Sequence, residues 1–184
     1  MTSSSKRVGK FLSLVLRHDP ARIGLTLDAR GWATVDDLLS RLADAGESLT
    51  RERLEEIVAA DDKQRFSFSE GGTRLRANQG HSVEVDLELV PRVPPDRLFH
   101  GTTARFTPSI RKHGLLRGER HHVHLSLDEA TATTVGGRRG VPVVLVVDAA
   151  AMVAAGHVFF LTENGVWLTE HVPREFLSWP CSES

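Results

Sequence analysis

The sequence has a single cysteine, no tyrosine and no long apolar run. Cys181 alone excludes a disulfide framework and a cysteine-ligated zinc site, and such sparse cysteine use is typical of a reducing compartment. No apolar segment reaches the length of a membrane span, and residues 1–5 are polar, without a signal-peptide core. From these absences we expect a cytoplasmic protein with no membrane partner, and we expect a monomer.

A strong charge of either sign is also missing. The 184 residues include 23 Lys and Arg against 24 Asp and Glu, so the formal net charge is -1. A general positive field that would attract nucleic acid is therefore excluded, and an anionic partner would have to bind a local cluster of cations. The 40% of hydrophobic residues is enough for one large domain or two small ones, each with its own core.

The first clear element is an amphipathic helix that ends near Pro20. Arg17 and His18 lie in its last turn, where cations suit the helix dipole, and Asp19 before the proline is pushed toward extended geometry. A fixed arginine beside a histidine also suits phosphate chemistry, although the dipole alone could explain both side chains. The apolar stripe that would anchor this helix consists of Val8, Phe11, Leu12, Val15 and Leu16.

The next part of the chain predicts a winged helix, meaning three helices followed by a hairpin ribbon. Arg65, Arg74 and Arg76 should lie on the polar face of that ribbon. Winged helices usually bind nucleic acid, but many serve only as scaffolds. The expected elements are a short strand at Ile23–Leu27, a helix capped by Thr34 and ended by Gly46, a helix capped by Thr50, and strands at 64–69 and 73–76.

A proline-rich segment, residues 91–96, predicts a linker, and beyond it short strands alternate with short helices. Two loops stand out here. The run Gly136–Gly140 places Arg138 and Arg139 amid glycines, which suits an anion clamp or a plain loop. The run His121–His124 suggests a metal site, but no carboxylate or cysteine completes a ligand set, so a hydrogen-bonding role for His124 is favoured.

Six short motifs stand in one order over nearly the whole chain, and together they closely resemble the RNA (tRNA) 2′-phosphotransferase family of the KptA type. The motifs are Leu16–Pro20, Lys63–Phe66, Gln79–His81, Phe99–Thr102, Arg120–Ser126 and Val135–Pro142.

The resemblance implies an α+β fold with two lobes. Residues 1–90 would form a winged-helix RNA-binding lobe, 91–96 the linker, and 97–184 an ADP-ribosyltransferase-like, NAD-binding lobe with a split β-sheet. It also implies a reaction that consumes NAD as co-substrate and needs no metal. The 2′-phosphate of an RNA splice junction, as in tRNA splicing, would first displace nicotinamide. A ribose hydroxyl would then attack the phosphorus, giving 2′-OH RNA and ADP-ribose 1″,2″-cyclic phosphate.

The catalytic residues implied by the resemblance are Arg17, His18, Arg65 and Arg138, with Arg138 chosen over Arg139 by register alone. Three guanidiniums can neutralise a phosphate dianion, and His18 is the candidate for proton transfer in the second step. We expect side chains from both lobes to meet over one phosphate. The residues implied for NAD binding are His100, Gly101, Thr102, Gly114, Leu115, His124, Leu125 and Ser126.

Two other functions remain open at this point. One is ADP-ribosylation of terminal phosphates on nucleic acid, which would stop at the ADP-ribosyl adduct. The other is a winged-helix regulator that senses NAD, which the near-neutral charge disfavours because tight duplex binding needs basic residues.

Overall fold

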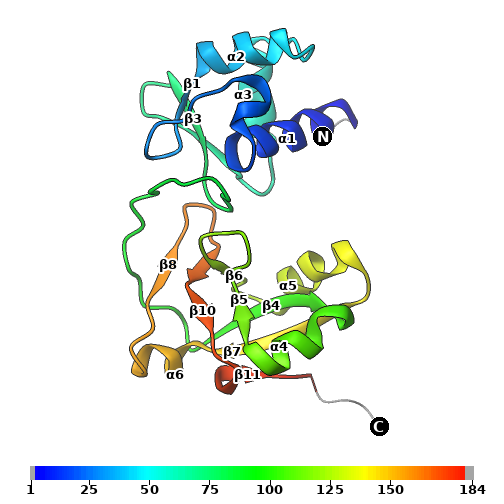
Figure 1. Ribbon diagram of the computed structural model, residues 1–184, viewed down its shortest axis with the longest axis vertical. Coiled ribbons are helices and arrows are strands. Elements are labelled where there is room, and N and C mark those ends of the chain that lie inside the picture. Colours follow the sequence, from blue (N-terminus) through cyan, green and yellow to red (C-terminus); the bar gives the residue numbers. More distant parts are fainter. Residues whose placement is uncertain (1–2, 181–184) are drawn as a thin grey trace. The chain divides into compact units, whose positions relative to one another are not determined.

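The computed structural model describes residues 3–180. The chain divides into two compact units, Met1–Glu88 and Leu89–Ser184 (Figure 1). Cys181 lies outside the described residues. Within 3–180, none of the helices has the length and apolarity needed to cross a bilayer. Each unit combines short helices with small antiparallel sheets, which confirms a mixed α and β fold. The finer assignment to a winged-helix lobe and an ADP-ribosyltransferase-like lobe stays a prediction.

The first unit has its helices where capping residues predict them. Thr34 accepts a hydrogen bond from Asp37 N–H, and Thr50 accepts one from Arg53 N–H, so each threonine caps a helix that follows it. The hairpin adds a third strand at Ala33–Thr34 that the sequence did not indicate, giving the order β1-β3-β2. The elements are α1 Ser3–Arg17, η1 Pro20–Ile23, β1 Ala33–Thr34, α2 Val35–Asp44, α3 Arg51–Ala59, β2 Phe66–Phe68 and β3 Arg74–Ala77.

The strand expected at Ile23–Leu27 is wrong. Asp19 accepts a hydrogen bond from Arg22 N–H and caps the 3-10 helix η1, in which Pro20 occupies the first turn. Gly24 then adopts φ 65°, and its N–H donates to Ala21 O, so the chain turns instead of extending. A local cap and a left-handed glycine therefore override the alternating pattern.

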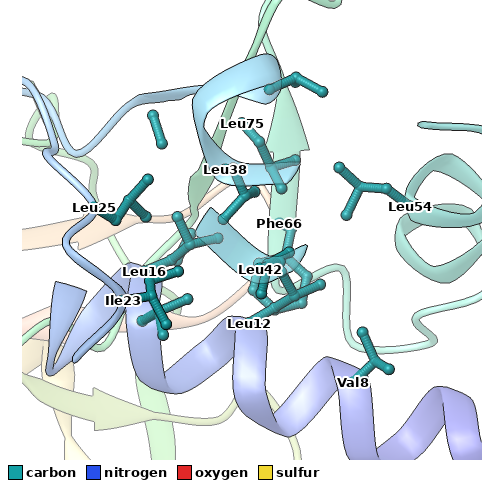
Figure 2. Packing of buried hydrophobic residues seen from close by; sticks show 14 of the residues in the cluster. Val8, Leu12, Leu16, Ile23, Leu25, Leu38, Leu42, Leu54, Phe66 and Leu75 are labelled. Carbon is teal, nitrogen blue, oxygen red and sulfur yellow. The ribbon is translucent and has the colours of Figure 1, made fainter. Parts of the chain in front are cut away.

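One hydrophobic core lies between the helices and one face of the sheet (Figure 2). Leu12 and Leu16 of α1, Leu38 of α2, Leu54 of α3 and Leu75 of β3 are all fully buried in it. Because alternate strand residues face opposite sides, Arg74 and Arg76 lie on the other face of the sheet. The core thus fixes the end of α1, where Arg17 lies.

The second unit is built on two three-stranded antiparallel sheets, β11-β7-β4 and β6-β9-β8, and a β5-β10 pair. Phe99 and Ser126 exchange both backbone hydrogen bonds, at 2.9 and 2.7 Å, and so connect β4 to the residue after β6. The elements are β4 Arg97–Thr103, η2 Ala104–Phe106, α4 Thr107–His113, β5 Leu115–Leu116, β6 Val123–Leu125, α5 Glu129–Gly136, η3 Gly137–Arg139, β7 Pro142–Asp148, α6 Ala149–Ala154, β8 Phe159–Leu161, β9 Trp167–Thr169, β10 His171–Val172, η4 Arg174–Phe176 and β11 Leu177–Ser178.

Gly101→Ala is expected to destabilise the protein strongly. Helix α5 packs so closely on β4 that a Cβ on Gly101 would lie 1.8 Å from the backbone oxygen of Ala132. Backbone cannot rotate away as a side chain can, so helix and strand must separate, which costs about 1–3 kcal/mol or more. Thermal unfolding measures the loss. The matched control is Gly137→Ala, where a Cβ meets nothing within 4 Å; an equal loss in both variants would contradict the explanation.

Candidate functional site

The end of α1 holds the arginine and histidine that the sequence singled out. His18 N–H and Asp19 N–H both donate to Leu14 O at 2.9 Å, which closes the helix. Arg17 Nη2 donates to the backbone oxygen of Arg65 at 3.3 Å, and its guanidinium lies 5.9 Å from the centre of the Phe66 ring. The structure therefore brings Arg17 next to the start of β2, 48 residues further along the chain.

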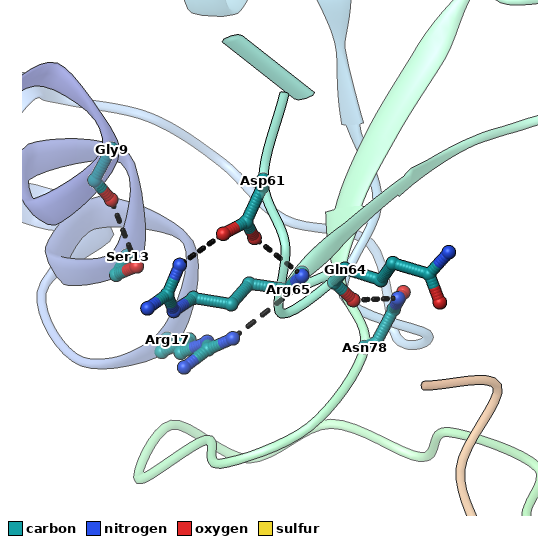
Figure 3. A network of polar contacts seen from close by, with 7 residues as sticks. All are labelled: Gly9, Ser13, Arg17, Asp61, Gln64, Arg65 and Asn78. Carbon is teal, nitrogen blue, oxygen red and sulfur yellow. Dashed lines mark hydrogen bonds and ion pairs between the residues drawn. The ribbon is translucent and has the colours of Figure 1, made fainter. Parts of the chain in front are cut away.

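A buried carboxylate holds Arg65 in place (Figure 3). The Asp61 side chain is only 4% exposed; it accepts a hydrogen bond from Arg65 N–H at 2.7 Å and forms an ion pair with the Arg65 guanidinium. The loop between them is tight, with Gln64 at φ 43° and Gln64 N–H donating to Asp61 O at 2.7 Å. The sequence reasoning missed Asp61, although its place four residues before Arg65 was a usable signal.

The segment after β3 completes this group of residues. Asn78 donates from its side chain to Gln64 O at 2.7 Å, and its N–H donates to Arg65 O at 2.9 Å. Further on, Ser82 N–H donates to Arg17 O at 2.9 Å, and a 2.9 Å hydrogen bond joins Ser82 Oγ to His18 Nδ1. Ser82 and Asn78 were also missed, because only the fold brings them to the end of α1.

We call this group, Arg17, His18, Asp61, Arg65 and Ser82, the α1-end cluster. The Arg17 guanidinium reaches the backbone of Arg65, and Ser82 bonds to both the backbone of Arg17 and the His18 ring. The Arg65 side chain is 33% exposed, so solvent reaches it. Each carboxylate oxygen of Asp61 accepts from Arg65, one from its backbone N–H and the other from its guanidinium. Such a set can bind an oxyanion with charge-assisted hydrogen bonds and can move a proton beside it.

The second unit brings three of the predicted ligand-binding residues together. His100 on β4 donates from Nδ1 to His124 O at 3.0 Å, and His124 donates from Nδ1 to His122 O at 3.1 Å. Ser126 pairs with Phe99, next to His100. Both donations fix the imidazole tautomers and leave each Nε2 as the acceptor while the ring is neutral.

Four other predicted residues serve the packing of the second unit. The side chains of Leu115 and Leu125 are 3% and 1% exposed and belong to its hydrophobic core. Gly114 has φ 73°, and a Cβ there would lie 2.1 Å from Val172 O, so this glycine allows a close backbone approach, as Gly101 does. These residues could meet a ligand only through backbone atoms.

Two predicted residues remain, Arg138 and Thr102. Arg138 lies in η3, directly after α5, and is exposed. Thr102 is buried at the end of β4. Among the residues described, no three His, Cys, Asp or Glu side chains gather as a metal site. The cap of α5 is Asp128, whose pKa is lowered by hydrogen bonds from the backbone and side chain of Thr131.

The stability of the protein is expected to fall as pH decreases below the unfolded histidine pKa of about 6.5, and His100 should contribute to that fall. Burial, with a smaller effect from the charge of Arg120, lowers the pKa of His100, while its bond to His124 O acts in the opposite direction. The unfolded chain therefore takes up this proton at higher pH than the folded protein does. The stabilisation is fully present above the unfolded pKa of about 6.5. It is lost progressively as the pH falls from that value to the lower pKa of the folded protein.

Urea unfolding of wild type and His100→Gln at several pH values measures this contribution. The variant should lose less stability on acidification, whereas His113→Gln, at an exposed position, should follow wild type. Parallel curves for wild type and His100→Gln would contradict the assignment. The pKa of His122 is also lowered, by burial and by His121 and Arg117. This residue is present in wild type and in both variants, so it contributes equally to the pH dependence of their stability.

Comparison with known proteins gives one consistent result. The model of the family described as "RNA 2′-phosphotransferase, Tpt1 / KptA family" matches residues 3–171. Proteins named "Probable RNA 2′-phosphotransferase" are similar to this chain in Nostoc punctiforme (53% identical, 93% of this chain and 94% of that protein), Streptomyces griseus (54%, 93% and 94%) and Escherichia coli O6:K15:H31 (53%, 92% and 93%).

Proposed function

Because the chain belongs to the RNA 2′-phosphotransferase, Tpt1 / KptA family, we propose that it removes an internal 2′-phosphate from RNA and transfers it to ADP-ribose derived from NAD. The products would be RNA with a free 2′-OH, nicotinamide and ADP-ribose 1″,2″-cyclic phosphate. As a transferase the chain needs a site for a dianionic phosphate and a site for a dinucleotide.

The α1-end cluster is the observation that carries this proposal. The Arg17 guanidinium donates to the backbone oxygen of Arg65, and Asp61 forms an ion pair with the Arg65 guanidinium. A phosphate dianion repels both a nucleophile and the charge of its own transition state, and preoriented guanidiniums offset that repulsion. The third guanidinium of the family pattern is assigned to Arg138, a role that rests on the resemblance alone.

The residues around His100 fit a neutral, hydroxyl-rich ligand such as the ribose groups of NAD. Since burial lowers the pKa of His100, the imidazole is neutral near pH 7, and its Nε2 can accept a hydrogen bond from a hydroxyl. Ser126 and Thr102 add hydroxyls at neighbouring positions. When bound, NAD supplies an anomeric carbon from which nicotinamide leaves as a phosphate oxygen attaches.

His18 is assigned the proton transfer of the second step. There, the 2″-hydroxyl of the ribose attacks phosphorus, the bond from phosphorus to the RNA 2′-oxygen breaks, and the proton passes from the hydroxyl to the departing oxygen. Imidazole can take and return such a proton near neutral pH. The bond between His18 Nδ1 and Ser82 Oγ orients the ring for this task.

Asp61→Asn is expected to lower kcat by about tenfold to a hundredfold, by analogy with other residues that orient a functional group. The amide loses the charge that anchors the Arg65 guanidinium, although it can still accept from Arg65 N–H. Asp61→Glu should recover part of the rate. Asp37→Asn, which removes an exposed carboxylate paired with Arg41 on α2, serves as control. Wild-type kcat in Asp61→Asn would exclude a positioning role.

The proposal is tested by incubating the protein with a short RNA that carries one internal 2′-phosphate, with and without NAD, and analysing masses. Loss of the phosphate only in the presence of NAD supports it. Loss without NAD would indicate a phosphatase. An RNA that gains an ADP-ribosyl group and keeps it would indicate an ADP-ribosyltransferase that stops at the adduct, as expected for the terminal-phosphate activity. Unchanged RNA would favour the NAD-sensing regulator.

A further inference from the structure

The face of the β1-β3-β2 sheet that turns away from the core carries an aromatic ring flanked by arginines. The guanidinium of Arg76 lies 4.5 Å from the centre of the Trp32 ring, and that of Arg74 lies 5.5 Å from it. The register explains the contact, because Ala33 is opposite Leu75, so that Trp32 is level with Arg76. We call Trp32, Arg74 and Arg76 the sheet-face triad.

The triad is built on rigid backbone. Trp32 N–H donates to Asp28 Oδ1, and Asp28 N–H donates to Trp32 O, both at 2.9 Å. Arg74 and Arg76 belong to the central strand β3. Arg74 Nη1 lies 3.4 Å from Asp28 Oδ2, and 49% of the Arg74 side chain is exposed. Both guanidiniums lie within cation–π distance of the indole, which restricts their movement, and a planar guanidinium held in this way suits the recognition of a phosphate.

The sheet-face triad continues directly from the α1-end cluster. Asn78 N–H donates to Arg65 O, so the β2-β3 pairing extends to Arg65, and Ser67 is opposite Arg76. Alternation then places Arg65 on the same side as Arg76, at a diagonal position about 7–8 Å away. Arg74 follows after about another 7 Å along β3. Arg65, Arg76 and Arg74 therefore form one row of cations that starts at the candidate phosphate site.

We propose that the sheet-face triad binds the single-stranded RNA that flanks the reactive 2′-phosphate, with Arg74 and Arg76 on successive backbone phosphates and Trp32 as a stacking surface. This inference rests on the proposed function, since it takes the α1-end cluster as the place of the 2′-phosphate. Charge complementarity and continuity with that cluster favour RNA over a protein partner. Local binding of this kind also suits a chain of net charge -1.

Binding without NAD tests the inference separately from catalysis. The affinity of a 2′-phosphorylated octanucleotide is measured over a range of salt concentrations for wild type and for the double variant Arg74→Gln/Arg76→Gln. Each lost phosphate contact lowers the slope of log K against log salt by about 0.7 for a single strand, so the slope should fall by about 1.4. Arg74→Lys/Arg76→Lys keeps the charges and should keep the slope. Arg41→Gln, on helix α2, is the matched control.

Tryptophan fluorescence gives a second measurement on the same samples. RNA should quench wild-type fluorescence, and Trp32→Phe should remove most of that quenching while Trp167 and Trp179 remain. An unchanged salt slope in the double glutamine variant would overturn the inference. If the same variant also changed the sedimentation of the protein, this face would instead be a contact between copies of the chain. If wild type binds RNA as expected but removes no 2′-phosphate, the proposed function fails and the sheet-face triad stands.

Discussion

Arg65→Ala is expected to lower the turnover of 2′-phosphorylated RNA by about a thousandfold or more, the size of effect seen when an arginine that stabilises a transferring phosphoryl group is removed. Arg65 is the residue on which the α1-end cluster converges: Asp61 pairs with its guanidinium, and Arg17 donates to its backbone oxygen. The truncation removes the Arg65 guanidinium, which Asp61 positions, and with it one of the positive charges proposed to face the phosphate. Single-turnover rates at saturating RNA and NAD measure the effect.

The stability of the Arg65→Ala variant needs its own control. Asp61 is 4% exposed, so removing its partner leaves a buried carboxylate that retains only the bond from the backbone N–H of residue 65. An under-satisfied buried group costs about 1–3 kcal/mol, which could lower activity through unfolding. The double variant Asp61→Asn/Arg65→Gln removes both charges and should melt closer to wild type. If it folds and turns over RNA at the wild-type rate, Arg65 is not catalytic.

His18→Ala is expected to accumulate RNA that carries an ADP-ribosyl group on its 2′-phosphate. The first step needs no proton transfer, because the phosphate nucleophile is already ionised, whereas the second step moves a proton from the ribose hydroxyl to the RNA oxygen. Loss of a general acid–base group typically costs a hundredfold to ten-thousandfold, so the second step should become much slower than the first. Mass analysis at early times detects the adduct.

Ser82→Ala provides the comparison for His18. It removes the hydroxyl that bonds to Nδ1 but leaves the imidazole, so the rate should fall less than in His18→Ala, with the same step affected. An unreacted RNA pool with no adduct in His18→Ala would contradict the assignment, since it would place the histidine in the first step or in phosphate binding.

Local signals in the sequence were sufficient for most elements. The threonine caps at residues 34 and 50 and the Asp128 cap of α5 each act within a few residues, so a single sequence contains them. The resemblance identified Arg17, His18 and Arg65, and the structure brings these residues into one cluster in the first unit. Arg138 in the second unit and the NAD-binding residues stay predictions as a site.

What the sequence could not supply depends on contacts between distant segments. The strands β5, β10 and β11 are only two residues long, and each exists because a partner lies beside it. Ser82 reaches His18 across 64 positions. Similarly, the resemblance implies ligand contact for Leu115 and Leu125, but their side chains fill the core. Pattern alone does not separate a position that packs in the core from one that binds a ligand.

The fate of the phosphorus atom tests the account most directly. An RNA with a radiolabelled internal 2′-phosphate is incubated with the full chain and NAD, and the label is followed by chromatography. We predict that the label leaves the RNA and appears in ADP-ribose cyclic phosphate in an amount equal to the nicotinamide released. Label released as inorganic phosphate, or retained on the RNA while nicotinamide is released, would contradict the account.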